Sequence, residues 1–222
     1  NYQQLFANVQ TYLANQFPNV FLADGTSVNA TTQINTFIEQ AEQRIYNSVQ
    51  FPSLRKNVTG VLTSSNKYLS APDDFLSTYS LAVIDASGNY EYLLNKDVNF
   101  IRQAYPNPTT DTGLPKYYAL FGPTVVSGGI TNELTFIMGP TPDASYAVEL
   151  HYYYYPESIT TANTTWLGDN FDTVLLYGSL VEAYTFMKGE QDMITLYNQK
   201  YVEALALAKR LGDGMERRDA YR

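Results

Sequence analysis

The first fifty residues alternate between hydrophobic and polar positions with the period of an α-helix. Apolar side chains recur every three or four residues over 2–15 and again over 34–45. Pro18 follows the first run and Pro52 follows the second, and proline seldom continues a helix. The pattern therefore predicts two amphipathic helices in this part of the chain.

Between about 58 and 156 the hydrophobic period falls to two, which is typical of β-strands. One helical segment, roughly 96–104 with Asn95 as its expected N-cap, interrupts this region. The sequence thus predicts a β-rich block, whose expected strands are 58–62, 79–84, 90–94, 116–121, 134–138 and 146–155.

The last of these strands contains four consecutive tyrosines, Tyr152 to Tyr155, before Pro156. Successive side chains of a strand point to opposite faces. One face is apolar throughout and is expected to be core, with Tyr146, Val148, Leu150, Tyr152 and Tyr154. The other face begins polar and becomes aromatic only at Tyr153 and Tyr155. We expect that end of the strand to be covered on both sides.

The helical period returns towards the end of the sequence. A broad apolar face over about 169–187 predicts a helix that contacts neighbours on more than one side, with Asp169 as its cap. Gly178 in its middle costs about 1 kcal/mol relative to Ala, which suggests a close approach by another helix. A final helix is expected over about 192–211, ended by Gly212.

The element order is therefore two helices, a β-rich block and two more helices. The two helical ends can bury their apolar faces only against each other. We interpret the chain as an α+β protein with a four-helix core, formed by the N- and C-terminal helix pairs, and an inserted antiparallel β-rich domain. The expected helical domain is discontinuous, 1–57 and 158–222, and the expected β-rich domain is 58–157.

Composition indicates a globular protein and removes several kinds of chemistry. The 222 residues are 45% hydrophobic and 16% charged. The absence of cysteine excludes disulfides, thiolate metal sites and cysteine nucleophiles, and a single histidine excludes a histidine cluster for zinc. No apolar run approaches the ~20 residues of a membrane span, and the first residues lack the pattern of a signal peptide. We expect a cytosolic origin and no membrane association.

The formal net charge of −8 is unevenly distributed. Five of the 14 basic residues lie in the last 14 positions, and residues 1–208 carry nine basic and 19 acidic groups, a net of −10. An acidic body does not favour binding to DNA phosphates. The basic C-terminal segment is more typical of a docking element.

Groups that could carry out catalysis are few. Any Ser-His-acid triad would depend on His151, which lies mid-strand, and the chain has no Gly-x-Ser-x-Gly motif. The pairs Asp73-Asp74 and Asp169/Asp172 could form a glycosidase couple. A turn after Pro72 and a helix N-terminus, however, favour aspartate for backbone reasons. No phosphate loop, dinucleotide motif or metal spacing occurs, so no enzyme activity, metal or cofactor is expected.

The aromatic content of 14% leaves sugar binding on stacked tyrosines as an alternative. Binding of single-stranded nucleic acid would require aromatics interleaved with Lys and Arg, and 146–155 contains neither. Coverage of a sheet edge or of a subunit contact is the simpler interpretation of these tyrosines.

Several short motifs occur in a fixed order along the chain. They are Ala41-Glu42-Gln43-Arg44-Ile45, Pro72-Asp73-Asp74-Phe75, Gly113-Leu114-Pro115-Lys116-Tyr117-Tyr118, Pro140-Thr141-Pro142, the tyrosine strand ending at Pro156, Trp166-Leu167 and the helix from Leu175 to Ala183. In this combination the chain resembles the head-to-tail adaptor proteins of tailed bacteriophages, also called connectors, gatekeepers or tail tubular proteins A. The resemblance covers about 41–187, and residues 1–30 and the last ten match no motif of the family.

The resemblance implies a non-enzymatic structural protein of the virion. Such a protein docks as a ring, usually of twelve copies, beneath the portal at the capsid vertex, extends the DNA channel and offers a platform for the tail. DNA would pass through the lumen without specific binding, and assembly would take place in the host cytoplasm. A carbohydrate-binding tail or fibre component is the alternative, and an acid/base glycosidase is a more distant one.

The resemblance also implies a role for the C-terminal segment, because adaptors of this kind commonly reach the portal with that segment. The candidate docking residues are Lys209, Arg210, Met215, Arg217, Arg218, Tyr221 and Arg222. Gly212 and Gly214 are expected to end the preceding helix and let the segment leave it. On the last strand, Tyr153 and Tyr155 are the candidates for a sheet or subunit contact.

Overall fold

The computed structural model describes residues 1–13, 17, 20–21, 23–24, 27–122, 124–126, 129–132 and 134–219. The chain divides into two compact units. We call Asn1–Leu54 with Tyr155–Arg222 the helical unit, and Arg55–Tyr154 the β unit.

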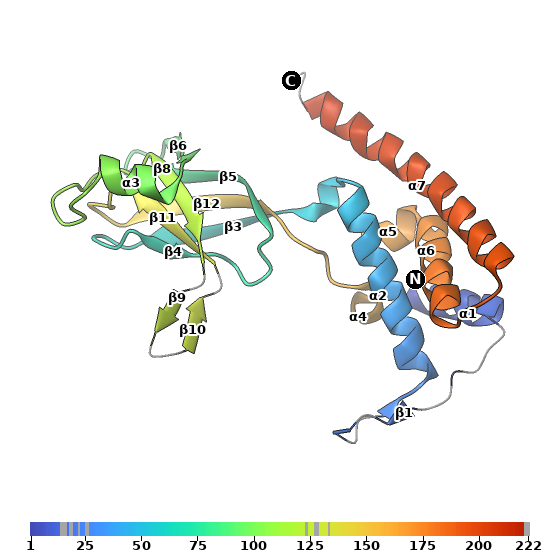
Figure 1. The fold of residues 1–222 in the computed structure, drawn as a ribbon. Coiled ribbons are helices and arrows are strands. Elements are labelled where there is room, and N and C mark those ends of the chain that lie inside the picture. The colour runs from blue at the N-terminus through green and yellow to red at the C-terminus, as the bar shows by residue number, and fades with distance from the viewer. Residues whose placement is uncertain are drawn as a thin grey trace. The chain divides into compact units, whose positions relative to one another are not determined.

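The helical unit is assembled from segments at both ends of the sequence (Figure 1). Most of it is α-helix, with one short antiparallel strand pair and a 3-10 turn. Its elements are α1 (Tyr2–Leu13), β1 (Val20–Phe21), β2 (Ser27–Val28), α2 (Ala30–Ser48), the 3-10 turn (Pro52–Leu54), α4 (Ile159–Ala162), α5 (Trp166–Asn170), α6 (Asp172–Phe186) and α7 (Gln191–Asp219).

Helix α6 packs against α1, α2 and α7. Its buried apolar residues include Val174, Leu175, Leu180 and Val181. At Gly178, an added Cβ would lie 3.2 Å from Cβ of Ala41 in α2 and 3.3 Å from Cε2 of Tyr201 in α7. The close approach predicted at this glycine is therefore present on two sides of α6.

In its described residues, the β unit contains two four-stranded sheets, a separate hairpin and one helix (Figure 1). The first sheet has the order β3–β12–β5–β6 and is antiparallel; the second has the order β4–β11–β8–β7 and is antiparallel except between β7 and β8. The elements are β3 (Arg55–Leu62), β4 (Tyr68–Ser70), β5 (Ser77–Ile84), β6 (Tyr90–Tyr92), β7 (Leu94–Asn95), α3 (Val98–Ala104), β8 (Tyr117–Phe121), β9 (Thr124–Val126), β10 (Gly129–Asn132), β11 (Thr135–Gly139) and β12 (Tyr146–Tyr153).

The core of the β unit combines residues from both sheets. One buried cluster contains Leu62, Leu81, Val83, Val148, Leu150 and Tyr152 from the first sheet and Tyr118, Phe136 and Met138 from the second. Helix α3 packs on the second sheet through Ile101, which is buried with Ala119 and Ile137. The inner faces of the two sheets thus share one core, and α3 covers the outer face of the second sheet.

The alternation of the tyrosine strand β12 follows the predicted pattern. Val148, Leu150 and Tyr152 are buried in the core, as expected for the apolar face. The ring of Tyr152 stacks on Phe75, and its hydroxyl donates a hydrogen bond to Oδ1 of Asp74 at 2.8 Å. A polar partner for the buried hydroxyl makes tyrosine suitable for this core position.

The predicted strand 90–94 is wrong as a single strand, because the chain changes sheet within it. Residues Tyr90–Tyr92 pair with β5 in the first sheet, whereas Leu94–Asn95 pair with β8 in the second. Leu93 lies at the crossing and is buried in the shared core. The consecutive apolar residues Tyr92, Leu93 and Leu94 interrupt the alternation at this point, and the single predicted strand passed over that interruption.

Two predicted helix caps are also wrong. Asp97, not Asn95, caps α3, and its carboxylate accepts a hydrogen bond from the backbone N–H of Asn99 at 2.7 Å. Asp169 lies inside the short helix α5, and α6 begins only at Asp172. The sequence shows one broad helical pattern here and conceals the break between the two helices.

Gly212 does not end the final helix, because α7 continues to Asp219. Glycine costs about 1 kcal/mol inside a helix relative to alanine. Residues that favour helix surround the two glycines of this segment, among them Leu211, Met215 and Glu216. The expectation that the chain leaves the helix at this point is therefore corrected.

Candidate interaction surfaces

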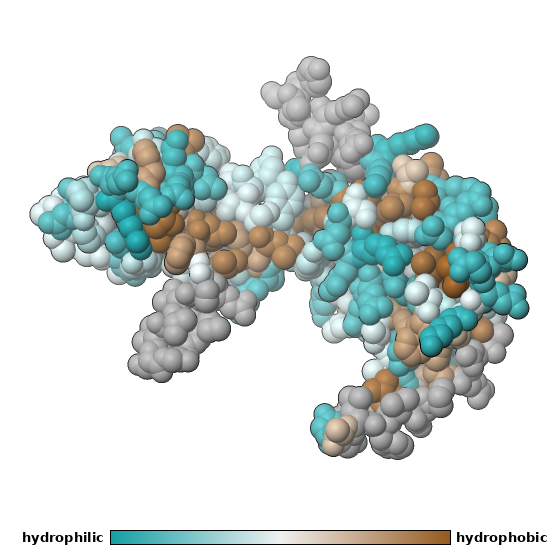
Figure 2. All heavy atoms as spheres, viewed as in Figure 1, coloured by the Kyte–Doolittle hydropathy of each residue, from teal (hydrophilic) through white to brown (hydrophobic). Residues whose placement is uncertain are grey.

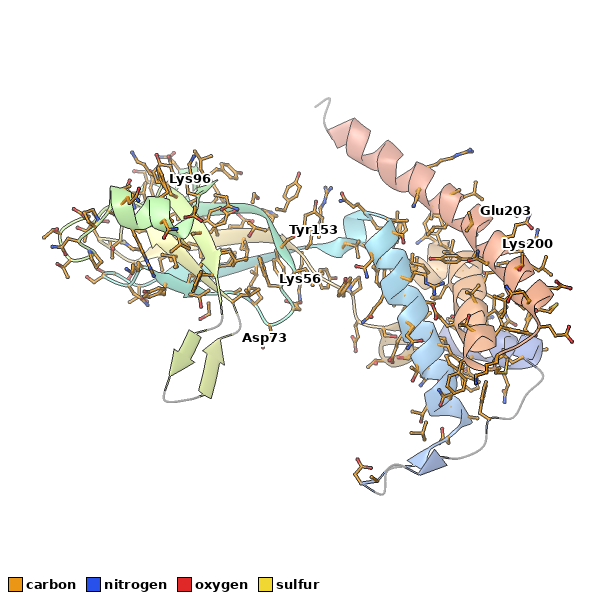
Figure 3. The ribbon with its side chains drawn as sticks, viewed as in Figure 1. Lys56, Asp73, Lys96, Tyr153, Lys200 and Glu203 are labelled. Atoms are coloured by element: carbon orange, nitrogen blue, oxygen red, sulfur yellow. The ribbon has the colours of Figure 1, made fainter. Side chains whose placement is uncertain are left out.

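Tyr153 lies on the outer face of the first sheet, on the side away from the shared core (Figure 3). The guanidinium of Arg55, its partner on β3, lies 5.8 Å from the centroid of the Tyr153 ring and 4.7 Å from that of Tyr79. The two rings meet edge to face with centroids 6.0 Å apart. We call Arg55, Tyr79 and Tyr153 the Arg55 cluster; a cation held over aromatic faces in this way is attracted by their quadrupoles.

A β-bulge accounts for the position of Tyr79. Along β12, His151 pairs with Ser80 of β5 but Tyr152 pairs with Thr78, so that Tyr79 is an extra residue in β5. A bulge of this kind re-aims the side chain of the extra residue. Tyr79 is 55% exposed and contributes its ring to the Arg55 cluster.

A polar network extends over the same face and connects all four strands of the first sheet. Nδ2 of Asn57 in β3 donates to Oε1 of Glu149 in β12 at 2.6 Å. The hydroxyl of Tyr90 in β6 bonds the same carboxylate, which raises the pKa of Tyr90. On β5, Oγ of Ser80 lies 3.3 Å from Nδ1 of His151. These bonds hold polar side chains in place across the sheet.

The outer face combines this network with exposed hydrophobic and aromatic side chains. Val61, Tyr79, Tyr90 and Tyr92 are each more than half exposed. Figure 2, which shows the molecule from the side of α3, has further hydrophobic residues at the surface of the β unit. Tyrosine and arginine are enriched in protein interfaces, and lysine and glutamate are depleted there. The outer face therefore has the composition of a protein contact surface.

Ser80, His151 and Glu149 are the residue types of a hydrolase triad, and the geometry does not suit that chemistry. Oε1 of Glu149 lies 3.7 Å from Nε2 of His151, which is too long for a hydrogen bond. Ser80 lies within a strand whose backbone is paired with β12, whereas an oxyanion hole requires N–H groups directed at the substrate. We interpret the three residues as part of the surface network.

Tyr155, the second candidate contact residue of the tyrosine run, lies beyond the end of β12 and belongs to the helical unit. Its hydroxyl donates a hydrogen bond to Oδ1 of Asn47 in α2, and its ring stacks on Tyr46 with centroids 6.4 Å apart. The structure therefore places Tyr153 and Tyr155 among different neighbours in different units.

The Ala41–Ile45 motif of α2 makes contacts inside the helical unit. Glu42 is 2% exposed, and its Oε1 accepts a hydrogen bond from the backbone N–H of Ile159 at 3.0 Å. Burial raises the pKa of Glu42, against the opposing effect of hydrogen bonds from Ser158 and Ile159. Sequence reasoning used the motif only as a family signal and missed this role; a carboxylate on the buried face of the predicted helix is the signal that could have shown it.

Arg44 of the same motif connects α2 to the two C-terminal helices. It forms an ion pair with Glu182 of α6. Its guanidinium also lies 5.7 Å from the centroid of the Tyr201 ring in α7. The motif therefore links N-terminal and C-terminal segments of the helical unit.

The candidate docking residues of the C-terminal segment follow the last buried positions of α7. Lys209 and Arg210 are exposed on the helix, one and two residues after buried Ala208. Met215, Arg217 and Arg218 fall within the helical range of α7. Tyr221 and Arg222 lie outside the described residues.

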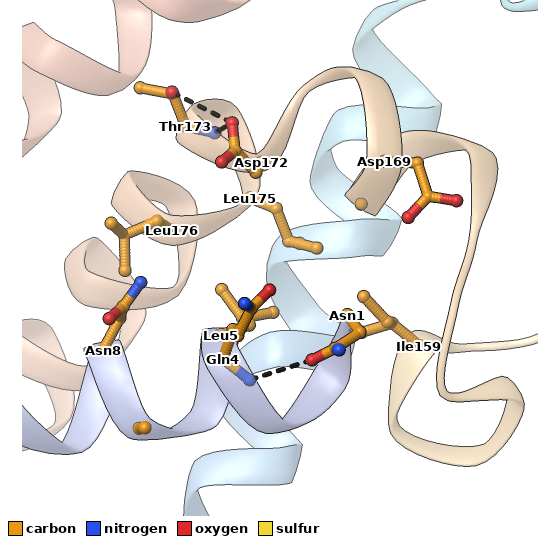
Figure 4. A pocket seen from close by; sticks show the side chains of 12 residues that line it. Asn1, Gln4, Leu5, Asn8, Ile159, Asp169, Asp172, Thr173, Leu175 and Leu176 are labelled. Carbon is orange, nitrogen blue, oxygen red and sulfur yellow. Dashed lines mark hydrogen bonds between the residues drawn. The ribbon is translucent and has the colours of Figure 1, made fainter.

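A pocket of about 650 Å³ opens between α1, α5 and α6 (Figure 4). Leu5, Ile159 and Leu175 give it an apolar floor, and Asp169 and Asp172 are among its polar lining. The two carboxylates point in separate directions, and Asp172 accepts a hydrogen bond from the backbone N–H of Thr173. In a glycosidase the two carboxyl groups face each other across the glycosidic bond of the substrate. Asp169 and Asp172 do not face each other in this way.

Two features are absent from the described part of the chain. Within it, no group of three or more His, Cys, Asp or Glu side chains is placed to hold a metal ion. None of the helices found there is long and apolar enough to cross a membrane.

These features define a protein that acts through surfaces: a β sandwich with one exposed sheet face, and a helical unit that ends in the long helix α7, on which Lys209 and Arg210 are exposed. The chain matches the SU10 adaptor protein family over residues 1–222 and belongs to this family of bacteriophage head-to-tail adaptors. The resemblance inferred from the motifs is thereby confirmed, and an adaptor of this family is a structural component that interacts with portal and tail proteins. A comparison with curated proteins found no match.

Proposed function

We propose that the protein assembles as a closed ring of twelve copies beneath the portal, at the head–tail interface of the virion. In this position it extends the DNA channel and provides the docking platform for the tail. Membership of the adaptor family over the whole chain is the observation that carries the proposal. The ring would assemble in the host cytoplasm, and the duplex would pass through its lumen without specific binding.

In this proposal the C-terminal segment contacts the portal. At 1.5 Å per residue, the 29 residues of α7 span roughly 43 Å, whereas the 15 of α6 span roughly 22 Å. The end of α7 is thus long enough to extend past its partner helix. Residues 209–222 contain five basic and three acidic groups, so the segment suits a groove with acidic walls.

The helical unit supplies the rigid part of the proposed ring. We suggest that α1, α2, α6 and α7 act as one four-helix core, because α6 packs on the other three and Gly178 allows two of them to approach closely. In the β unit, Tyr153 and the rest of the Arg55 cluster are proposed to contribute to a subunit or tail contact. Tyr155 would act through α2, to which it is bonded.

Native mass and particle images test the ring directly. We would purify the full chain and examine it alone and mixed with the portal protein of the same phage. A closed ring of twelve copies, alone or on the portal, is the expected result. A protein that stays monomeric in the presence of portal would overturn the proposal.

A carbohydrate-binding tail component is the second candidate, favoured by the exposed rings of Tyr79, Tyr90 and Tyr92 on one sheet face. Stacking on such rings would make binding sensitive to each tyrosine. Glycan array binding by the wild type that Tyr79→Ala abolishes would favour this candidate over the adaptor ring.

A further inference from the structure

The two four-stranded sheets of the β unit have four edge strands, β3, β6, β4 and β7, which differ in length. Three are short, as is usual where a protein prevents its sheet edges from pairing with other chains: β4 and β6 have three residues and β7 has two. The fourth, β3, has eight residues and pairs with β12 in unbroken register along its whole length. One sheet edge is therefore long and regular.

The long edge is also accessible. Within the described residues, β12 is the one strand that pairs with β3, so along residues 57–62 the opposite edge of β3 pairs with no described strand. Five of the eight residues of β3 are exposed, including Val58 and Val61. Residues 57–62 carry no charge, and charged side chains are a common means of blocking an edge. Such an edge is a template for an extended peptide, which main-chain hydrogen bonds would hold.

The β9–β10 hairpin has the complementary property. Its two strands pair with each other and, within the described residues, with no strand of either sheet. It projects from the sheets of the β unit (Figure 1). Residues 122–132 are uncharged and rich in Thr, Val and Gly. An isolated two-stranded hairpin is marginally stable in water, so pairing of its free edge would stabilise it.

We propose that the β9–β10 hairpin of one copy pairs with the free edge of β3 in the next copy of the chain. The inference rests on the proposed ring, whose contacts are heterologous: one surface of each copy meets a different surface of its neighbour. Each copy carries one hairpin and one β3 edge, so in a closed ring every β3 edge pairs with the hairpin of a neighbouring copy. A portal or tail protein on β3 would leave the hairpins unpaired, which is why a second copy is the occupant.

Paired cysteines test this contact, because the natural chain has none. We would prepare Thr59→Cys in β3 and Val125→Cys in β9 as separate proteins, mix them during assembly on the portal, and isolate the ring-sized fraction. A short bismaleimide reagent should join one copy of each variant into a covalent dimer. Repeating the experiment with Asn57→Cys and Val61→Cys, on the same strand face, allows for a different register. Ser87→Cys, in the turn between β5 and β6, is the matched control and should not react with Val125→Cys.

A second variant tests whether ring formation depends on the hairpin. Replacing residues 124–132 by a two-residue Gly-Ser link should leave the melting temperature within about 2 °C, because the hairpin pairs with neither sheet. It should abolish ring formation. Wild-type rings that yield no dimer in any of the three cysteine pairs, or intact rings without the hairpin, would overturn the inference while leaving the adaptor proposal standing. Absence of wild-type rings would overturn both.

Discussion

The carboxylate of Glu42 in α2 accepts a hydrogen bond from the backbone N–H of Ile159, 117 residues further along the chain. The neighbouring Glu39 accepts a hydrogen bond from the hydroxyl of Thr160 at 2.9 Å. Two carboxylates, one turn apart on α2, therefore hold the start of α4, where the chain has returned to the helical unit. The contact between the N-terminal and C-terminal segments of this unit depends on a buried acid, and its stability should depend on pH.

Glu42→Gln tests that dependence. Burial raises the pKa of Glu42 in the folded protein above its ordinary value of 4.5. A raised pKa contributes stability below pH 4.5, and this contribution is lost as the pH rises through the folded value. The variant should therefore match the wild type in free energy of unfolding below pH 4.5 and become more stable than the wild type at higher pH. Urea titrations across this range would measure the difference.

Glu42→Ala is the matched control for the hydrogen bond. It leaves the buried N–H of Ile159 without its acceptor, which typically costs about 1–3 kcal/mol. We expect this loss to be fully present below pH 4.5 and to shrink at higher pH, where the wild type loses the stability that the raised pKa contributes. If Glu42→Gln lost as much stability as Glu42→Ala, the charge would be contributing to the bond, and the interpretation of the raised pKa would be wrong.

Gly178→Leu should destabilise the helical unit by about 1–3 kcal/mol or more, which is the usual effect of overpacking. The first added atom would already lie within 3.3 Å of Ala41 and Tyr201, and a leucine adds three more carbon atoms beyond it. Gly178→Ala is the graded control: its gain in helix propensity of about 1 kcal/mol opposes the close contact. Unchanged melting of the leucine variant would contradict close packing of α2 and α7 on α6.

Periodic features of the fold were predictable because each one repeats along the sequence. Burial of Val148, Leu150 and Tyr152 follows from alternation in one strand, and the helices follow from a three-to-four-residue repeat. Gly178 was informative for a different reason: a residue that destabilises a helix indicates a contact that requires it.

Features that depend on distant partners were not predictable in this way. The bulge at Tyr79 exists because β12 and β5 change register, and no local signal marks it. At Leu93 the run Tyr92-Leu93-Leu94 interrupts the alternation, but the run alone does not say that the chain pairs with two different sheets on either side of it. The cap of α3 was predicted at Asn95 instead of Asp97 because both residue types are good N-caps. Gly212 was predicted to end the helix because glycine often follows a helix, but α7 continues through it. Of the residues of the Arg55 cluster, the sequence pointed only to Tyr153. Arg55 lies 98 positions earlier and comes close to Tyr153 only because β3 pairs with β12.

The acidic body predicts weak interaction with DNA. Residues 1–208 carry a net charge of −10, and a lumen that is neutral to acidic would let a duplex slide without adhering. The protein truncated after Leu211 should bind linear duplex DNA more weakly than about 10⁻⁴ M at physiological salt, the weak end of non-specific binding. Fluorescence anisotropy at several salt concentrations would measure this. Tight binding that weakens steeply with salt would show a basic surface on the body and contradict the prediction.

Truncation after Leu211 also tests the proposed portal contact. The variant keeps the buried residues Tyr197, Tyr201, Leu205 and Ala208 of α7, so it should fold and melt like the full chain. Its binding to portal in a co-sedimentation assay should weaken by at least about tenfold, or about 1.4 kcal/mol, because five of the seven candidate docking residues, Met215, Arg217, Arg218, Tyr221 and Arg222, are lost.

A full-length variant with Arg217, Arg218 and Arg222 changed to Gln separates charge from length. If the arginines act as forked donors to acidic walls, this variant should lose most of the affinity that truncation removes. If the truncated protein lost portal affinity and the arginine variant did not, the contact would be made by the helix backbone and its apolar side chains rather than by the arginines. Undiminished binding by a folded truncated protein would show that residues 212–222 do not contact the portal.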